Sequence, residues 1–190
     1  AESFNQPIDS WDVSSVIDMR GMFLVAKSFN QPLNSWDVSS VTNMDYMFNG
    51  TEKFNQPLDS WDVSSVRNMS FMLSNASSFN QPLNSWDVSS VKYMSNIFDE
   101  AIKFNQPLDS WDVSNVTNMS LMFCKCYNFN QDLTGWNTSH ISESGVTDMF
   151  RGCKKLEKRD QWCDETNHRI KSEMECLSLI HISEPTRLAI

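Results

Sequence analysis

The sequence predicts an α/β repeat solenoid, with short parallel strands on one face and short helical or 3₁₀ turns on the other. Three observations support this fold class. Phenylalanine recurs every 25 residues from Phe4 to Phe129, and tryptophan does so from Trp11 to Trp136. Within each copy the apolar residues form one strand-like pattern and one helix-like pattern. A single copy cannot bury these side chains alone, whereas stacked copies bury them against each other.

The second copy, residues 29–53, shows the expected elements in chain order. Residues 30–32, Asn-Gln-Pro, predict a turn because proline fixes φ. Residues 33–38 have apolar side chains at the spacing of a short strand, which leaves the alternate residues facing outwards. Apolar residues then follow at steps of three and four over residues 41–48, which predicts one or two turns of helix or 3₁₀.

The domain organisation follows from where the repeat decays. Residues 1–156 are expected to form a solenoid of six coils, the last of them degenerate, because Asp132 replaces the proline and two extra residues lie near residues 143–145. Decay at one end is typical of a capping repeat. Residues 157–175 are polar and of mixed charge, which predicts a C-terminal cap. Residues 176–190 contain LSLIHISEPTR, which resembles translated vector read-through, so we predict a non-native or disordered tail there.

Charge and hydropathy exclude two classes of partner. The net charge of −9 has the wrong sign for a free nucleic-acid-binding protein. No run of 18 apolar residues occurs, so we expect no membrane span. The oligomeric state stays open.

A repeated polar strip supplies the candidate ligand-binding residues. If residues 33–38 form a strand, small polar and acidic side chains line its outer face in every coil. We call this set the Ser/Asp strip, and it comprises Ser35, Asp37, Ser39, Ser60, Asp62, Ser64, Ser85, Asp87, Ser89, Ser110 and Asp112.

The aspartates of this strip suggest a second possibility, an acidic face that binds a cation. Carboxylates in neighbouring coils would lie ~4.8 Å apart and repel each other. Ca²⁺ prefers such oxygen ligands, and the candidate ligands are Asp12, Asp37, Asp62, Asp87 and Asp112. The alternative is that each aspartate accepts local hydrogen bonds from serine neighbours or turn amides. No other cofactor is expected.

Other unusual residues are better explained as core. The tryptophans and methionines occupy inward positions, so burial is a better explanation than sugar or copper binding. Cys126 and Cys153 take a position held by alanine or threonine in other copies, which predicts buried thiols. A disulfide such as Cys153–Cys163 near the cap is the alternative, and the disulfide state of all five cysteines stays open: Cys124, Cys126, Cys153, Cys163 and Cys176. The three histidines all lie late in the chain and no catalytic motif occurs, so we predict that the protein is not an enzyme.

The phrase F-N-Q-P-L-x-S-W-D-V-S-x-V-x-x-M, which recurs over residues 4–128, resembles the BspA-like branch of the leucine-rich repeats. This branch occurs in bacterial surface proteins and Mycoplasma-type lipoproteins. The resemblance implies a right-handed, leucine-rich-repeat-like solenoid with a cell-surface or extracellular location. It also implies a non-catalytic adhesion or binding role with a protein or glycan partner. The alternative function is a structural spacer with no ligand of its own.

Overall fold

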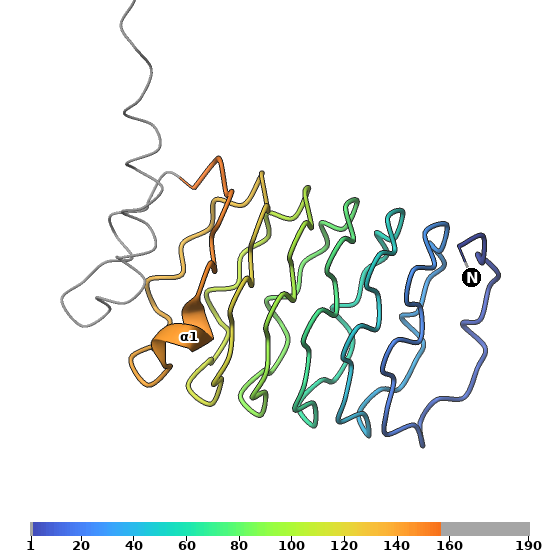
Figure 1. The fold of residues 1–190 in the computed structure, drawn as a ribbon. Coiled ribbons are helices and arrows are strands. Elements are labelled where there is room, and N and C mark those ends of the chain that lie inside the picture. Colours follow the sequence, from blue (N-terminus) through green and yellow to red (C-terminus); the bar gives the residue numbers. More distant parts are fainter. Residues whose placement is uncertain (1, 157–190) are drawn as a thin grey trace, which may run out of the picture.

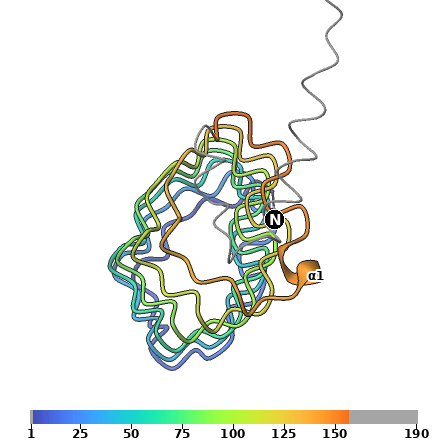
Figure 2. The same ribbon diagram turned by 90° about the vertical axis from the view of Figure 1, so that its left-hand side faces the viewer.

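The computed structural model describes residues 2–156, which form a row of stacked coils (Figure 1). Seen along the row, successive coils follow nearly the same path (Figure 2). We number the coils from the N-terminus, as residues 4–28, 29–53, 54–78, 79–103, 104–128 and 129–156. The predicted cap and tail, residues 157–175 and 176–190, lie outside the described residues.

The predicted α/β fold class is wrong, because residues 2–156 contain almost no regular secondary structure. The helix that the structure assigns is α1, Glu143–Val146, which lies at the two-residue insertion of coil 6. The β-pairing between coils consists of isolated parallel bridges such as Asn43↔Asn68, and these do not extend into a sheet within residues 2–156. The segment predicted as a strand, 33–38, and the segment predicted as helical, 41–48, are both successions of turns and irregular backbone.

Apolar residues that are three positions apart form the two ends of β-turns instead. The backbone N–H of Trp36 donates to the carbonyl of Leu33 at 3.1 Å, and Val41 donates to Val38 at 2.9 Å. Residues at the two ends of such a turn lie within 7 Å of each other. In this protein both ends of these turns point inwards, so an apolar pair three residues apart marks a corner of the coil.

Left-handed residues prevent regular strands along residues 42–50 and their equivalents, where the coils pair most closely. Met44, Tyr46, Phe48 and Gly50 donate N–H to carbonyls of coil 3 at 2.8 to 3.0 Å. Two of these residues have left-handed φ, 56° at Tyr46 and 72° at Gly50. A positive φ at the third residue of a turn identifies a type II turn. The backbone therefore bends at every few residues while still pairing with its neighbour.

Most of these left-handed positions carry no glycine. They recur at the equivalents of residues 21 and 25 in each coil, and the non-glycine residues there are Val25, Tyr46, Phe71, Asn75, Asn96, Glu100, Leu121, Lys125 and Asp148. A left-handed φ costs an L-residue roughly 1–2 kcal/mol. The inter-coil hydrogen bonds must offset this cost in every coil.

The core consists of the same side chains repeated coil after coil. In coil 2 the buried apolar residues are Phe29, Leu33, Trp36, Val38, Val41, Met44, Met47 and Phe48. Phenylalanines of successive coils stack, with ring centroids 5.9 Å apart for Phe29 and Phe54. The predicted burial of tryptophan is confirmed from coil 2 onwards, whereas Trp11 in coil 1 is 54% exposed.

Each buried indole also has a polar partner. Nε1 of Trp61 donates to the carbonyl of Leu33 in the preceding coil at 3.1 Å, and the tryptophans from Trp36 to Trp136 repeat this bond. The predicted burial of Cys126 and Cys153 is confirmed as well, and their thiols donate to backbone carbonyls. Cys163 and Cys176 lie outside the described residues.

The F-N-Q segment builds a polar counterpart to the aromatic stack. The side-chain oxygen of Asn30 accepts the backbone N–H of Asn55 at 2.9 Å and the side-chain amide of Gln56 at 3.2 Å. The same contacts recur in other coils. We call the accepting residues the asparagine ladder, and they are Asn5, Asn30, Asn55, Asn80 and Asn105.

No helix within residues 2–156 has the length and the apolar character that crossing a membrane requires.

Candidate functional site

The Ser/Asp strip lies at the surface, but its side chains bond to the coils themselves. Oδ1 of Asp37 accepts hydrogen bonds from the backbone N–H and the hydroxyl of Ser39, at 3.0 and 2.7 Å. Asp12, Asp62, Asp87 and Asp112 each accept from the serine two residues later. The local hydrogen bonds weighed as the alternative to cation binding are therefore present in these coils.

The first serine of each strip segment contacts the previous coil. The hydroxyl of Ser35 donates to the carbonyl of Asp9 at 2.7 Å, and Ser85 donates to Asp59 at 2.9 Å. Ser60 and Ser110 make the equivalent bonds. These hydroxyls stabilise the stacking of coils. This structural role explains why serine recurs at the position, and no ligand is needed to account for it.

The electrostatics of the strip follow from the same hydrogen bonds. The serine hydroxyl first, and the serine amide second, lower the pKa of Asp12, Asp37, Asp87 and Asp112. The charge of a neighbouring aspartate acts in the opposite direction, as Asp12 does on Asp37. Within residues 2–156, no group of three or more histidine, cysteine, aspartate or glutamate side chains could hold a metal ion.

We expect calcium at millimolar concentration to leave the Tm unchanged. A cation that binds only the folded state raises Tm as its concentration increases, but one oxygen of each strip aspartate is already engaged by serine. The measurement is a thermal melt of chelator-treated protein titrated with calcium, with magnesium in parallel. A rise in Tm with calcium alone would contradict this expectation and support the acidic face as a cation site.

A different face carries the residues that distinguish one coil from the next. Over residues 29–41 and 54–66 the two copies differ at a single position, Asn34 against Asp59. Over residues 42–53 and 67–78 they differ at most positions. Five of the differing positions in the paired segment contribute no side chain to the hydrophobic core.

We call these positions the variable face. They are residues 17, 20, 21, 24 and 25 of coil 1 together with their equivalents in coils 2 to 5. In coil 2 they are Thr42, Asp45, Tyr46, Asn49 and Gly50, and in coil 3 they are Arg67, Ser70, Phe71, Ser74 and Asn75. A position-by-position comparison of the copies could have found this face from the sequence alone.

Aromatic and cationic side chains occupy the middle of the variable face. The rings of Tyr46 and Phe71 stack with centroids 4.5 Å apart and planes 5° apart. Arg67 and Lys92 are exposed, and the adjoining Tyr93 is 47% exposed. Ion pairs link coils at either side, Arg20 with Asp45 at 3.6 Å and Lys125 with Glu100. This mixture suits contact with a partner better than the uniform Ser/Asp strip does.

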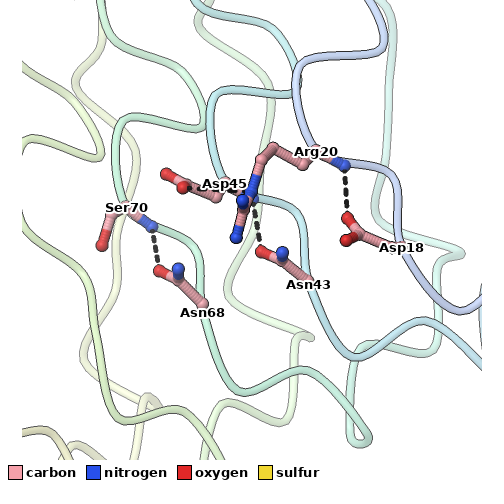
Figure 3. Close-up of polar contacts among 6 residues, drawn as sticks. All are labelled: Asp18, Arg20, Asn43, Asp45, Asn68 and Ser70. Atoms are coloured by element: carbon pink, nitrogen blue, oxygen red, sulfur yellow. Dashed lines mark hydrogen bonds and ion pairs between the residues drawn. The ribbon is translucent and has the colours of Figure 1, made fainter.

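Beside this face, a row of side chains at the surface accepts hydrogen bonds from the backbone of the turns. The side-chain oxygens of Asp18, Asn43 and Asn68 each accept the backbone N–H two residues later, at 2.8 to 3.1 Å (Figure 3). Asp45 lies next to this row. Its Oδ1 atom is buried and accepts no hydrogen bond from any described residue. Burial raises the pKa of the Asp45 carboxyl and the Asp18 charge adds to the shift, while Arg20 opposes it.

Asp45→Asn should therefore stabilise the protein at pH 7. A raised pKa means that the folded state binds the proton more readily than the unfolded state. Stability thus falls as pH rises from the unfolded pKa through the folded one, and the loss is complete above both. The gain from the substitution should shrink near pH 3, below the ordinary aspartate pKa of about 3.9. Urea unfolding at pH 7 and at pH 3 measures the change in the free energy of unfolding that the substitution causes.

The matched control is Asp59→Asn, because Asp59 is exposed and asparagine occupies its position in coils 2 and 4. We expect this control to change stability by less than about 0.5 kcal/mol at either pH. Equal gains from both substitutions would assign the effect to overall negative charge and overturn the role of the buried oxygen.

Comparison with known proteins gives one match. A family model described as "Mycoplasma protein of unknown function, DUF285" matches residues 1–98 and, in an overlapping second match, residues 58–164. No curated protein and no solved structure matches the chain.

Proposed function

The chain belongs to the DUF285 family, a Mycoplasma family of unknown function, and we propose that it is a non-catalytic binding module at a cell surface. The observation that carries this proposal is the variable face. Coils 1 to 5 are nearly identical along 29–41 and its equivalents but differ at the variable face. Part of this face is exposed, and Ser70, Ser74, Asn96 and Cys124 within it are buried. Residues needed only for the fold repeat in each coil, whereas residues that fit one partner differ along the row.

The chemistry of the face supports a protein or glycan partner. The Tyr46–Phe71 stack and the exposed Tyr93 offer aromatic surface. Aromatic residues are enriched where one protein binds another. Asn49 and Asn75 can donate and accept hydrogen bonds beside these rings, and Arg67 and Lys92 add positive charge to an otherwise acidic protein. The cell-surface location rests on the family resemblance of the repeat.

The Ser/Asp strip is the less suitable contact surface. Its hydroxyls and carboxylates already form hydrogen bonds within and between coils. A ligand would have to compete with these bonds. A structural spacer, the alternative function, would need no variable face at all.

The experiment compares one variant on each surface. Labelled protein is applied to a printed glycan array and to a printed protein array. The face variant is Lys92→Glu with Tyr93→Ser, two exposed residues, and the control is Ser35→Ala with Ser85→Ala on the strip. We expect binding that the face variant loses and the control keeps. Binding lost only by the control would place the contact on the strip, and no binding on either surface would favour the spacer.

A further inference from the structure

Coil 4 lacks a turn-stabilising hydrogen bond that coils 1, 2, 3 and 5 make. In those coils the residues equivalent to Asp18 accept the backbone N–H two residues later, at 2.8 to 3.1 Å. Tyr93 holds this position in coil 4, and no described residue accepts the N–H of Ser95. The tyrosine side chain is 47% exposed. Tyrosine at this position therefore lowers stability and places an aromatic ring at the surface.

A second unfavourable arrangement lies directly beside Tyr93. Arg67 and Lys92 hold the same position in coils 3 and 4, and the N–H of Lys92 donates to the carbonyl of Arg67 at 2.9 Å. Paired chains lie ~4.8 Å apart, and like charges opposite each other destabilise the pairing. Both side chains are exposed, and neither forms an ion pair with another residue of the 2–156 range.

The fold requires neither arrangement. Threonine holds the position of Arg67 and Lys92 in coils 2 and 5, as Thr42 and Thr117. The backbone pairing is the same there, since the N–H of Thr117 donates to the carbonyl of Lys92 at 2.9 Å. Residues that oppose stability are typical of functional sites. Two such features at adjoining positions of one surface therefore indicate a site of contact.

We propose that Arg67, Lys92 and Tyr93 dock a protein segment that presents an acidic side chain next to an apolar one. This inference rests on the proposed function of the variable face and names the chemistry of its partner. Nη1 of Arg67 lies 3.5 Å from the carbonyl oxygen of Ser90, so the guanidinium reaches coil 4, to which Lys92 belongs. One carboxylate can accept hydrogen bonds from both cations and relieve their repulsion. The Tyr93 ring offers apolar surface to the neighbouring residue of the segment.

The surroundings favour a protein segment over a polyanion such as a sulfated glycan. The positive charge at this position is confined to coils 3 and 4, because Thr42 and Thr117 flank it. Asp45 and Glu100 lie on the same face, and the whole chain carries a net charge of −9. A long row of anions would meet this negative charge, whereas one carboxylate among neutral residues would not. Tyrosine and arginine are also the residue types in which protein interfaces are enriched.

The experiment measures binding of the full chain to a printed array of short peptides of known sequence. We expect the bound peptides to be enriched in aspartate or glutamate beside an apolar residue, and binding to weaken as sodium chloride screens the charges. The test variant combines Arg67→Thr, Lys92→Thr and Tyr93→Asn, which introduces residues that other coils carry. Its affinity should fall about tenfold or more, as on removal of an interface hot spot. Its Tm should rise, because the turn hydrogen bond returns and the repulsion disappears.

The matched control is Lys53→Ser with Lys103→Ser, two exposed lysines outside the variable face. It removes the same positive charge and introduces the serine that coils 1 and 3 carry there. We expect this control to keep the binding and the preference for acidic peptides. An equal loss in the control would assign the effect to overall charge and overturn the site.

Three further results would overturn this inference. They are peptide binding without an acidic preference, equal binding by the test variant, and a test variant with a lower Tm, which would show that the three side chains serve the fold. Stronger binding to heparin than to any peptide would assign the cations to a polyanion and overturn it as well. The proposed function fails on a different result, which is the absence of binding on both the protein and the glycan array.

Discussion

Trp61→Ala is expected to lower the free energy of unfolding by about 3–5 kcal/mol, the usual cost of deleting a buried large aromatic side chain. The Trp61 side chain is 3% exposed and lies 6.2 Å from the Phe48 ring, centroid to centroid. Its loss leaves a cavity between coils and deprives the Leu33 carbonyl of its indole partner. Because each coil is stabilised by its neighbours, the defect weakens the array at its middle.

Trp11→Ala is the matched control, since Trp11 holds the same repeat position in coil 1 but is 54% exposed. We expect its cost to be a small fraction of that of Trp61→Ala. Differential scanning calorimetry is the suitable measurement, because its signal does not depend on the tryptophans being removed. Equal losses from the two substitutions would show that the indole contributes in some way other than burial between coils.

The contrast between these tryptophans also shows what the sequence could predict. Strict recurrence identified the repeat and assigned Trp36, Met44 and the cysteines at the small-residue position to the interior, as found. Burial depends mainly on which side chains are apolar and how often they recur. It does not depend on the backbone conformation that carries them inwards.

The backbone conformation was the part that the sequence did not reveal. A three-residue spacing such as Met44 to Met47 fits a 3₁₀ turn and equally fits the two ends of a β-turn. The left-handed conformation could not be predicted from residue type, because Tyr46, Phe71 and Leu121 are not residues that favour positive φ. The pairing between coils selects that conformation, and no local pattern in one copy encodes it.

The candidate site, like the fold, could be predicted from the sequence only in part. The strip residues were expected at the surface, where they lie, but the bonds from Ser35 to the preceding coil depend on how coils stack. The buried Oδ1 of Asp45, which accepts no hydrogen bond from a described residue, depends on the fold as well, and serine occupies the Asp45 position in coils 3 to 5. Contacts made between copies require the structure, whereas differences between copies were available in the sequence.

Asn55→Ala should cost about 1–3 kcal/mol, the penalty for leaving a partly buried donor without its acceptor. Oδ1 of Asn55 accepts the backbone N–H of Asn80 at 2.9 Å and the side-chain amide of Gln81 at 3.2 Å. Gln81 keeps a second acceptor in the Asn55 carbonyl, so the Asn80 N–H bears the larger loss. Asn34→Ala is the control, because Asn34 is exposed and only its backbone carbonyl bonds to the next coil.

Asn55→Asp tests whether the asparagine ladder works as a row of acceptors. Both groups that contact Oδ1 are donors, so a carboxylate can accept from them and should restore most of the stability at pH 7. Those donors hold the folded pKa below the unfolded one, so the restored stability should disappear as pH falls through the folded pKa. Urea unfolding from pH 7 to acid measures this profile, and a flat one would contradict it.

Aspartate in every coil would instead stack like charges, which repel at the spacing of neighbouring chains. A neutral acceptor that repeats without repulsion is a physical reason for asparagine at this position in each copy.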